Sequence, residues 1–150
     1  MAFYLKTSAD IDASPDRVWE ILADLPSYAT WNPLITEAAG ELATGERLEL
    51  WLQPIAGKGM RIKPTVTVAE PARELRWLGR LGVRGVFDGE HRFVLEPTAT
   101  GTHLEHEERF TGVLVPFMAR RLRARVLPAF ELMNRALAAR AEAVCTELAA

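Results

Sequence analysis

The feature that most constrains this fold is a change of hydrophobic period along the chain. Between residues 34 and 110, apolar and polar residues alternate, as at Leu48, Glu49 and Leu50, and glycines and prolines interrupt the alternation. Such alternation is typical of antiparallel strands that have one covered face and one face in water. With a further strand over residues 3–11, we expect a sheet of roughly seven strands.

From about residue 115 the period becomes helical. Apolar residues at helical spacing form one stripe, made of Met118, Leu122, Val126, Phe130, Met133, Leu137, Ala141 and Val144. A helix that carries this stripe would be about 45 Å long, which is enough to cross a small domain. Pro128 lacks an amide hydrogen and crowds the preceding turn, so we expect a kink there.

Two short helices are expected after the first strand. Ser14-Pro15-Asp16 offers a capping residue, a proline at the first helical position and an acid in the first turn. Pro26 ends this helix. The second short helix would hold Tyr28 and Trp31 and would close before Pro33.

This order of elements predicts an α+β fold in which a curved antiparallel sheet wraps around the C-terminal helix. The arrangement buries the helix stripe against the apolar face of the sheet. A strongly curved sheet cannot contact a helix everywhere, so a cavity is expected between them. With 150 residues, 49% of them hydrophobic, and no repeat or linker, we expect one domain over residues 1–150.

The sequence also resembles a known family. Its opening segment IDASPDRVWE (residues 11–20), followed by Trp31-Asn32-Pro33, is similar to the START-like (SRPBCC) superfamily in its polyketide cyclase/dehydrase and lipid-transport branch. Matching residue types continue at Val68, Glu70, Pro71, Leu75, Trp77, His91, Phe93, Leu95, Gly101, Thr102, Leu104, Phe110 and Gly112. The resemblance implies a helix-grip fold with a hydrophobic pocket for lipids, polyketides, quinones or hormones.

Three polar residues are the candidates for catalysis. If Leu95 pairs with Thr102 across the last hairpin, His91 faces His106, whereas a slip of two residues sets His91 opposite Glu108. Either register brings both histidines and the glutamate to one face of the sheet, which we expect to be the apolar face.

Such a group could anchor a mostly apolar ligand or act as a general acid or base, because histidine titrates near neutral pH. Alternatively, these side chains only bond to one another or face solvent. Two imidazoles and a carboxylate can bind zinc. No recognisable ligand spacing supports that, so we expect neither a metal nor another cofactor.

The expected ligand-contacting residues come from the sheet and from the helix stripe. They are Trp31, Trp77, His91, Phe93, His106, Glu108, Phe110, Met118, Leu122, Val126, Phe130 and Met133. Most large aromatic residues could equally be core. Trp51 lies opposite its leucine neighbours in the alternation, so either a bulge is present or one set is exposed.

Residues 120–125 contain a cluster of arginines on the predicted helix. The cluster could meet an anionic membrane or an acidic head-group, or it could be a solvated face with salt bridges. The glycines of residues 57–59 and 79–85 predict hairpin loops, which could act as lids over the cavity.

Charge and composition limit the partners. A net charge of -2 and a pI near 5.9 give no general attraction to nucleic acid. No apolar run approaches the ~20 residues of a membrane span, so we expect no stable membrane insertion. Residues 1–6 lack the basic start and apolar run of a secretory signal, so we expect a cytoplasmic protein. The single cysteine, Cys145, suits that compartment, and we expect it to pack as a small apolar group. A homodimer is left open.

We therefore expect a binder of a hydrophobic small molecule that needs no catalysis. The first alternative is a polyketide cyclase or dehydratase that uses His91, His106 or Glu108 to move protons. The second is a lipid or quinone chaperone that contacts a partner through residues 120–125.

Overall fold

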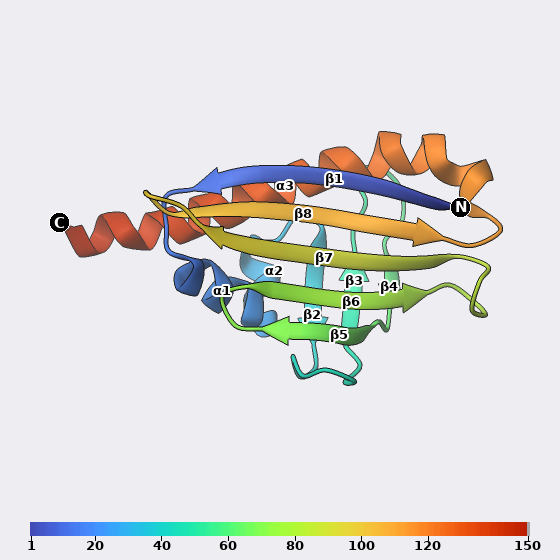
Figure 1. Cartoon of the computed structure of the whole chain (residues 1–150), viewed down its shortest axis with the longest axis horizontal. Coiled ribbons are helices and arrows are strands. Elements are labelled where there is room, and N and C mark those ends of the chain that lie inside the picture. Colours follow the sequence, from blue (N-terminus) through green and yellow to red (C-terminus); the bar gives the residue numbers. More distant parts are fainter. Residues whose placement is uncertain (150) are drawn as a thin grey trace.

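The computed structural model describes residues 1–149, with side chains described to residue 143. An antiparallel sheet curves along one long helix (Figure 1). In chain order the elements are β1 (Ala2–Ile11), α1 (Pro15–Ala23), the 3-10 helix η1 (Leu25–Ser27), α2 (Tyr28–Trp31), β2 (Ile35–Ala39), β3 (Glu49–Leu52), β4 (Met60–Ile62), β5 (Thr65–Glu70), β6 (Glu74–Arg80), β7 (Asp88–Pro97), β8 (Thr102–Thr111) and α3 (Val115–Ala149). The α+β helix-grip prediction is confirmed.

The strands form a five-stranded sheet in the order β1-β8-β7-β6-β5 and a three-stranded sheet in the order β2-β3-β4. The expectation of roughly seven strands in one sheet is therefore wrong in detail. The alternating run that begins at Met60 is divided at Pro64, which has no amide hydrogen for a ladder. Its two halves become β4 and β5, one in each sheet, and Leu48 N donates to Pro64 O across the boundary at 2.9 Å.

The beginning of the chain folds as its residues predict. The Ser14 hydroxyl accepts a hydrogen bond from Arg17 N at 3.2 Å and caps α1, with Pro15 at its first position. The α1 helix ends at Ala23, and Pro26 follows in η1.

The β7–β8 hairpin decides which polar residues meet. His91 pairs with Glu108, Phe93 with His106, and Pro97 with Thr102. The first register considered from the sequence is therefore wrong, and the slipped one is right. The turn occupies only residues 98–101, because Thr98 N donates to Gly101 O at 2.9 Å and Pro97 stays in the strand.

The α3 helix runs unbroken through Pro128 along the inner side of the sheet (Figure 1). Phe130, Met133 and Leu137 are fully buried, whereas Leu122 and Val126 are half-buried. The predictions for Val144 and Cys145 fall outside the residues whose side chains are described. Among the described residues, no helix is long and apolar enough to cross a bilayer.

The β3 strand keeps its regular alternation. Leu48 and Leu50 are buried, and Trp51 is half-buried on the opposite face, where its indole nitrogen donates to Gln53 Oε1 at 3.4 Å. The irregularity in this sheet lies in β2, between Ile35 and Glu37, where the register shifts.

Candidate functional site

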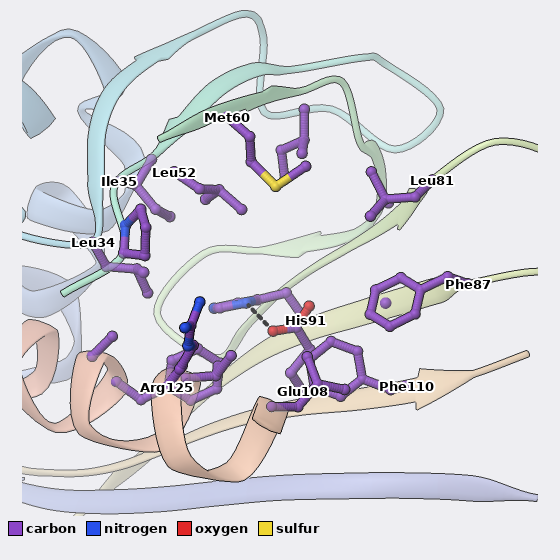
Figure 2. Close-up of a pocket in the computed structure, with 18 of the residues that line it drawn as sticks. Leu34, Ile35, Leu52, Met60, Leu81, Phe87, His91, Glu108, Phe110 and Arg125 are labelled. Atoms are coloured by element: carbon purple, nitrogen blue, oxygen red, sulfur yellow. Dashed lines mark ion pairs between the residues drawn. The ribbon is translucent and has the colours of Figure 1, made fainter. Parts of the chain in front are cut away.

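A cavity of about 290 Å³ lies between the first half of α3 and the inner faces of both sheets (Figure 2). From the candidates expected from the sequence, the structure brings together Trp77, His91, Glu108, Phe110, Met118, Leu122, Val126 and Phe130 in its wall. The expected ligand contacts did not include the other wall residues, which are Leu34, Ile35, Leu52, Pro54, Lys58, Met60, Ile62, Gly79, Arg80, Leu81, Phe87, Gly89, Arg125 and Ala129.

The cavity exists because the sheet lacks side chains at one place. Gly79 of β6 pairs with Gly89 of β7, and both line the cavity. Neighbouring positions on the same inner face carry Trp77 and His91, whose rings stack at 4.9 Å. A flat patch without side chains beside large rings leaves a hollow that the helix does not fill.

His91 and Glu108 form the polar corner of this mostly apolar wall. His91 Nδ1 lies 3.6 Å from Glu108 Oε2, and only 7% of the His91 side chain is exposed (Figure 2). The two groups form an ion pair only if the His91 imidazole carries a second proton.

A chain of hydrogen bonds continues from His91 into the interior. His91 Nε2 lies 2.8 Å from His106 Nε2, and His106 Nδ1 lies 2.7 Å from Asn134 Oδ1. Asn134 Nδ2 donates to Thr7 Oγ1 at 2.8 Å, and this hydroxyl donates to the backbone oxygen of His106 at 3.2 Å. The chain links β7, β8, α3 and β1.

Burial, reinforced by the charge that His91 can carry, holds the pKa of His106 well below the ordinary histidine value, although the hydrogen bond to Asn134 opposes this. His106 is therefore neutral at neutral pH. A neutral imidazole has one N–H donor and one acceptor nitrogen.

The partners then assign the protons. Because the Asn134 amide nitrogen donates to Thr7, its oxygen accepts from His106 Nδ1–H, which leaves His106 Nε2 as an acceptor. His91 must donate to that acceptor from its own Nε2–H. The Nδ1 atom of His91 is consequently the one that faces Glu108 and can accept a proton or a ligand hydrogen bond.

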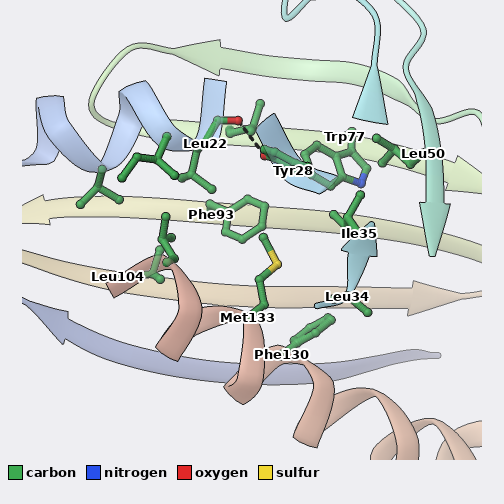
Figure 3. Close-up of a cluster of buried hydrophobic side chains, with 14 of the residues drawn as sticks. Leu22, Tyr28, Leu34, Ile35, Leu50, Trp77, Phe93, Leu104, Phe130 and Met133 are labelled. Carbon is green, nitrogen blue, oxygen red and sulfur yellow. Dashed lines mark hydrogen bonds between the residues drawn. The ribbon is translucent and has the colours of Figure 1, made fainter. Parts of the chain in front are cut away.

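Four of the predicted ligand contacts do not line the cavity. Phe93 and Met133 face each other in the packed part of the interior (Figure 3). His106 lies behind His91 and is fully buried. Trp31 packs edge-on against Tyr28 at 5.2 Å.

Asn134 and Thr7 are polar residues that sequence reasoning missed. The signal for Asn134 was available, since it follows Phe130 by four residues and so shares the buried face of α3. Thr7 gave no comparable signal. Within the described residues, no group of three or more histidine, cysteine or carboxylate side chains is arranged to hold a metal ion.

The family profile described as polyketide cyclase / dehydrase and lipid transport matches residues 3–142. The chain belongs to this family. A comparison with curated proteins finds no similar sequence.

Several solved structures have the same fold as this chain. The Zhui aromatase/cyclase from Streptomyces sp. R1128 has a TM-score of 0.76 at 22% identity, over 95% of this chain and 94% of that one. A START superfamily protein from Mycobacterium smegmatis has a TM-score of 0.72 at 20% identity, over 94% and 98%. The di-domain ARO/CYC StfQ of the steffimycin biosynthetic pathway has a TM-score of 0.77 at 14% identity, over 97% of this chain and 52% of that one. At these identities the likeness concerns the fold alone.

Proposed function

We propose that this polyketide cyclase/dehydrase and lipid transport family member binds a hydrophobic small molecule, such as a lipid, a polyketide or a quinone, in the cavity under α3. The observation that carries the proposal is a cavity of about 290 Å³ with an apolar wall and one convergent polar corner. Burying about 300 Å² of apolar ligand surface contributes roughly 7 kcal/mol before the entropy of association is subtracted. Binding therefore needs few polar contacts.

The polar corner gives the ligand an orientation. His91 Nδ1 and the Glu108 carboxylate both accept hydrogen bonds when His91 is neutral, so they favour a ligand that carries a hydroxyl group at the end entering this corner. A ligand with only acceptor atoms there would leave buried acceptors unpaired.

Binding is tested with the neutral fluorescent probe N-phenyl-1-naphthylamine and by mass spectrometry of lipids extracted from the purified protein. Leu122→Trp places a larger side chain in the cavity wall and is expected to weaken probe binding at least about tenfold. Leu132→Trp, on the exposed side of the same helix, is the matched control. Equal probe affinity in both variants and in the parent protein would contradict binding in this cavity.

Acid–base catalysis of the cyclase or dehydratase type is a second candidate, favoured by the hydrogen-bond chain that fixes the His91 tautomer beside Glu108. In a dehydration, a base removes a proton from carbon and an acid protonates the departing hydroxyl, so that one water leaves and the protonation of the pair is restored. His91 and Glu108 are close enough to share these two tasks.

This second candidate is tested with an aromatic β-hydroxyketone, whose dehydration product absorbs in the near ultraviolet. His91→Gln and Glu108→Gln are each expected to lower turnover about a hundredfold, while His103→Gln, on the other face of β8, leaves it unchanged. No turnover by the parent protein, with probe binding retained, would identify a binder instead.

A further inference from the structure

Two loops lie side by side at the end of the molecule where α3 begins. They are residues 81–87 between β6 and β7 and residues 112–114 between β8 and α3, and Figure 1 places both far from the C-terminus. Val113 N donates to Gly85 O at 3.0 Å, and Leu114 N donates to Val86 O at 3.2 Å. The backbone holds the two loops together, so their side chains present one surface.

This surface is unusually apolar and exposed. Phe117 is 86% exposed, Val83 is 72% exposed and Val113 is 67% exposed, with Leu114 and Leu81 also exposed beside them. We call these five residues the apolar tip. Single exposed hydrophobic residues are common, but several of them gathered on two hydrogen-bonded loops and the adjoining first turn of α3 mark an interaction site.

Arginines flank the apolar tip. Arg84 lies in the first loop, and Arg120, Arg121, Arg123 and Arg125 follow Phe117 on α3; we call these residues the basic rim. No acidic residue occurs between Gly112 and Phe130, although the whole chain has a net charge of -2. The rim is therefore a local concentration of positive charge on a slightly negative protein.

The basic rim lacks an ion-pair partner among the described side chains. Among residues 1–143, whose side chains are described, no carboxylate forms an ion pair with a rim arginine. Arg123 instead packs over the Phe3 ring, with its guanidinium carbon 5.5 Å from the ring centroid. The face is solvated, as one sequence interpretation held, but it lacks the salt bridges that this interpretation included.

We propose that the apolar tip and the basic rim dock together on the surface of an anionic phospholipid membrane. The tip residues would enter the boundary between head-groups and acyl chains, while the arginines bind lipid phosphates. The positive charge of the basic rim favours an anionic surface. The apolar tip favours a surface that has a hydrophobic layer below its charged head-groups. Docking of this kind places the protein on the membrane surface and requires no membrane-spanning helix.

The apolar tip is continuous with the cavity. Leu81 belongs to both, and Met118 and Leu122 continue the wall directly after Phe117 on α3. A docked protein would hold this end of the cavity against the membrane, so that an apolar molecule could pass between them with little contact with water. The docking itself does not depend on what the cavity holds.

Vesicle flotation tests the proposal. The full chain is mixed with vesicles of phosphatidylcholine alone or with about 30% phosphatidylglycerol, whose negative surface potential attracts arginine. We expect flotation only with phosphatidylglycerol. The bound fraction should fall as salt rises, because the screening length shrinks from about 10 Å at 0.1 M to about 3 Å at 1 M.

Variants separate the two components. Phe117→Ser should weaken binding about tenfold or more through lost apolar burial, and Arg120→Glu with Arg121→Glu should weaken it by at least a similar factor. Leu132→Ser and Arg140→Glu change exposed residues of the same helix outside the tip and the rim, and should bind as the parent does. Circular dichroism melting checks that each variant is folded.

Several results would overturn the proposal. One is equal flotation with neutral and anionic vesicles, and another is unchanged binding by Phe117→Ser. A third is the absence of flotation together with a concentration-dependent dimer that Phe117→Ser abolishes in sedimentation velocity, since the tip would then contact a second copy. Absence of flotation together with a monomeric parent would point to an acidic protein partner and would equally overturn it.

Discussion

The two halves of α3 face the same curved sheet but meet opposite surroundings. Around Met133 and Leu137, large side chains such as Phe93 and Leu104 fill the interior, and α1 and α2 close it from one side (Figures 1 and 3). Around Met118 and Leu122, the facing strands carry Gly79 and Gly89, and a cavity remains. The difference shows that the space comes from what the sheet omits, since both halves of the helix present large apolar residues, such as Leu122 in the first and Met133 in the second.

Removing volume should have the largest effect and should separate the two halves clearly. Met133→Ala is expected to lower the free energy of unfolding by about 2–5 kcal/mol because it opens a void in a packed region. Met118→Ala, at a half-buried position beside existing space, should cost less than about 1 kcal/mol. Urea unfolding of both variants measures the contrast, and similar costs would show that the halves are equally packed.

Adding volume should have the next largest effect, and it should again destabilise the packed half of α3 more than the half beside the cavity. Leu137→Phe overpacks a fully buried position and should lower the free energy of unfolding by about 1–3 kcal/mol. Leu122→Phe fills cavity space, so its stability should change by less than about 0.5 kcal/mol while probe binding weakens. If Leu122→Phe were the more destabilising variant, the cavity would be absent in solution.

The smallest effect concerns His106, which lies between the two halves. Burial depresses the pKa of His106 in the folded protein, so below about pH 6.5 the unfolded state binds more protons than the folded state does. The free energy of unfolding should therefore decrease as the pH is lowered, by up to about 1.4 kcal/mol per pH unit. His106→Leu should flatten this slope between pH 6.5 and 5, whatever it does to overall stability. Urea unfolding across this pH range provides the measurement.

His103 is the control histidine for that experiment. Its hydrogen bond to Asp10 raises its pKa, so its contribution is present below the unfolded pKa and is lost as pH rises through the folded pKa. His103→Gln should therefore change the slope above about pH 6.5 and leave the slope between pH 6.5 and 5 nearly unchanged. A flattened slope in His103→Gln would contradict the assignment of His106 as the buried neutral histidine.

The fold could be predicted because the patterns that specify its strands and its long helix are local in the chain. Alternation in residues 34–110 predicted antiparallel strands, and the stripe through Phe130 predicted the long helix. The exact number of strands depended on Pro64, where one alternating run divides between two sheets. The register of the last hairpin depended on a turn of four residues, a detail that alternation cannot fix because a slip of two keeps every side chain on its face.

The site was harder to predict because it depends on contacts between distant segments. The sequence indicated that His91 and Glu108 share a face, but Asn134 and Thr7 complete their network from elements that only the tertiary fold brings together. Whether an inward residue lines the cavity or joins the core depends on the volume opposite it. Phe93 faces Met133 and is core, whereas Phe110 borders the hollow.

The paired glycines of β6 and β7, Gly79 and Gly89, also determine how easily substitutions can alter the cavity. Neither Gly79 nor Gly89 has a positive φ, so an L-residue fits the backbone at both positions. A Cβ at position 79 would meet nothing nearer than 3.8 Å, while one at position 89 would displace only the flexible end of Glu108. Single substitutions there would reduce the cavity volume by one or two carbon atoms with every strand still paired, so the size of the cavity can change without a change in strand pairing.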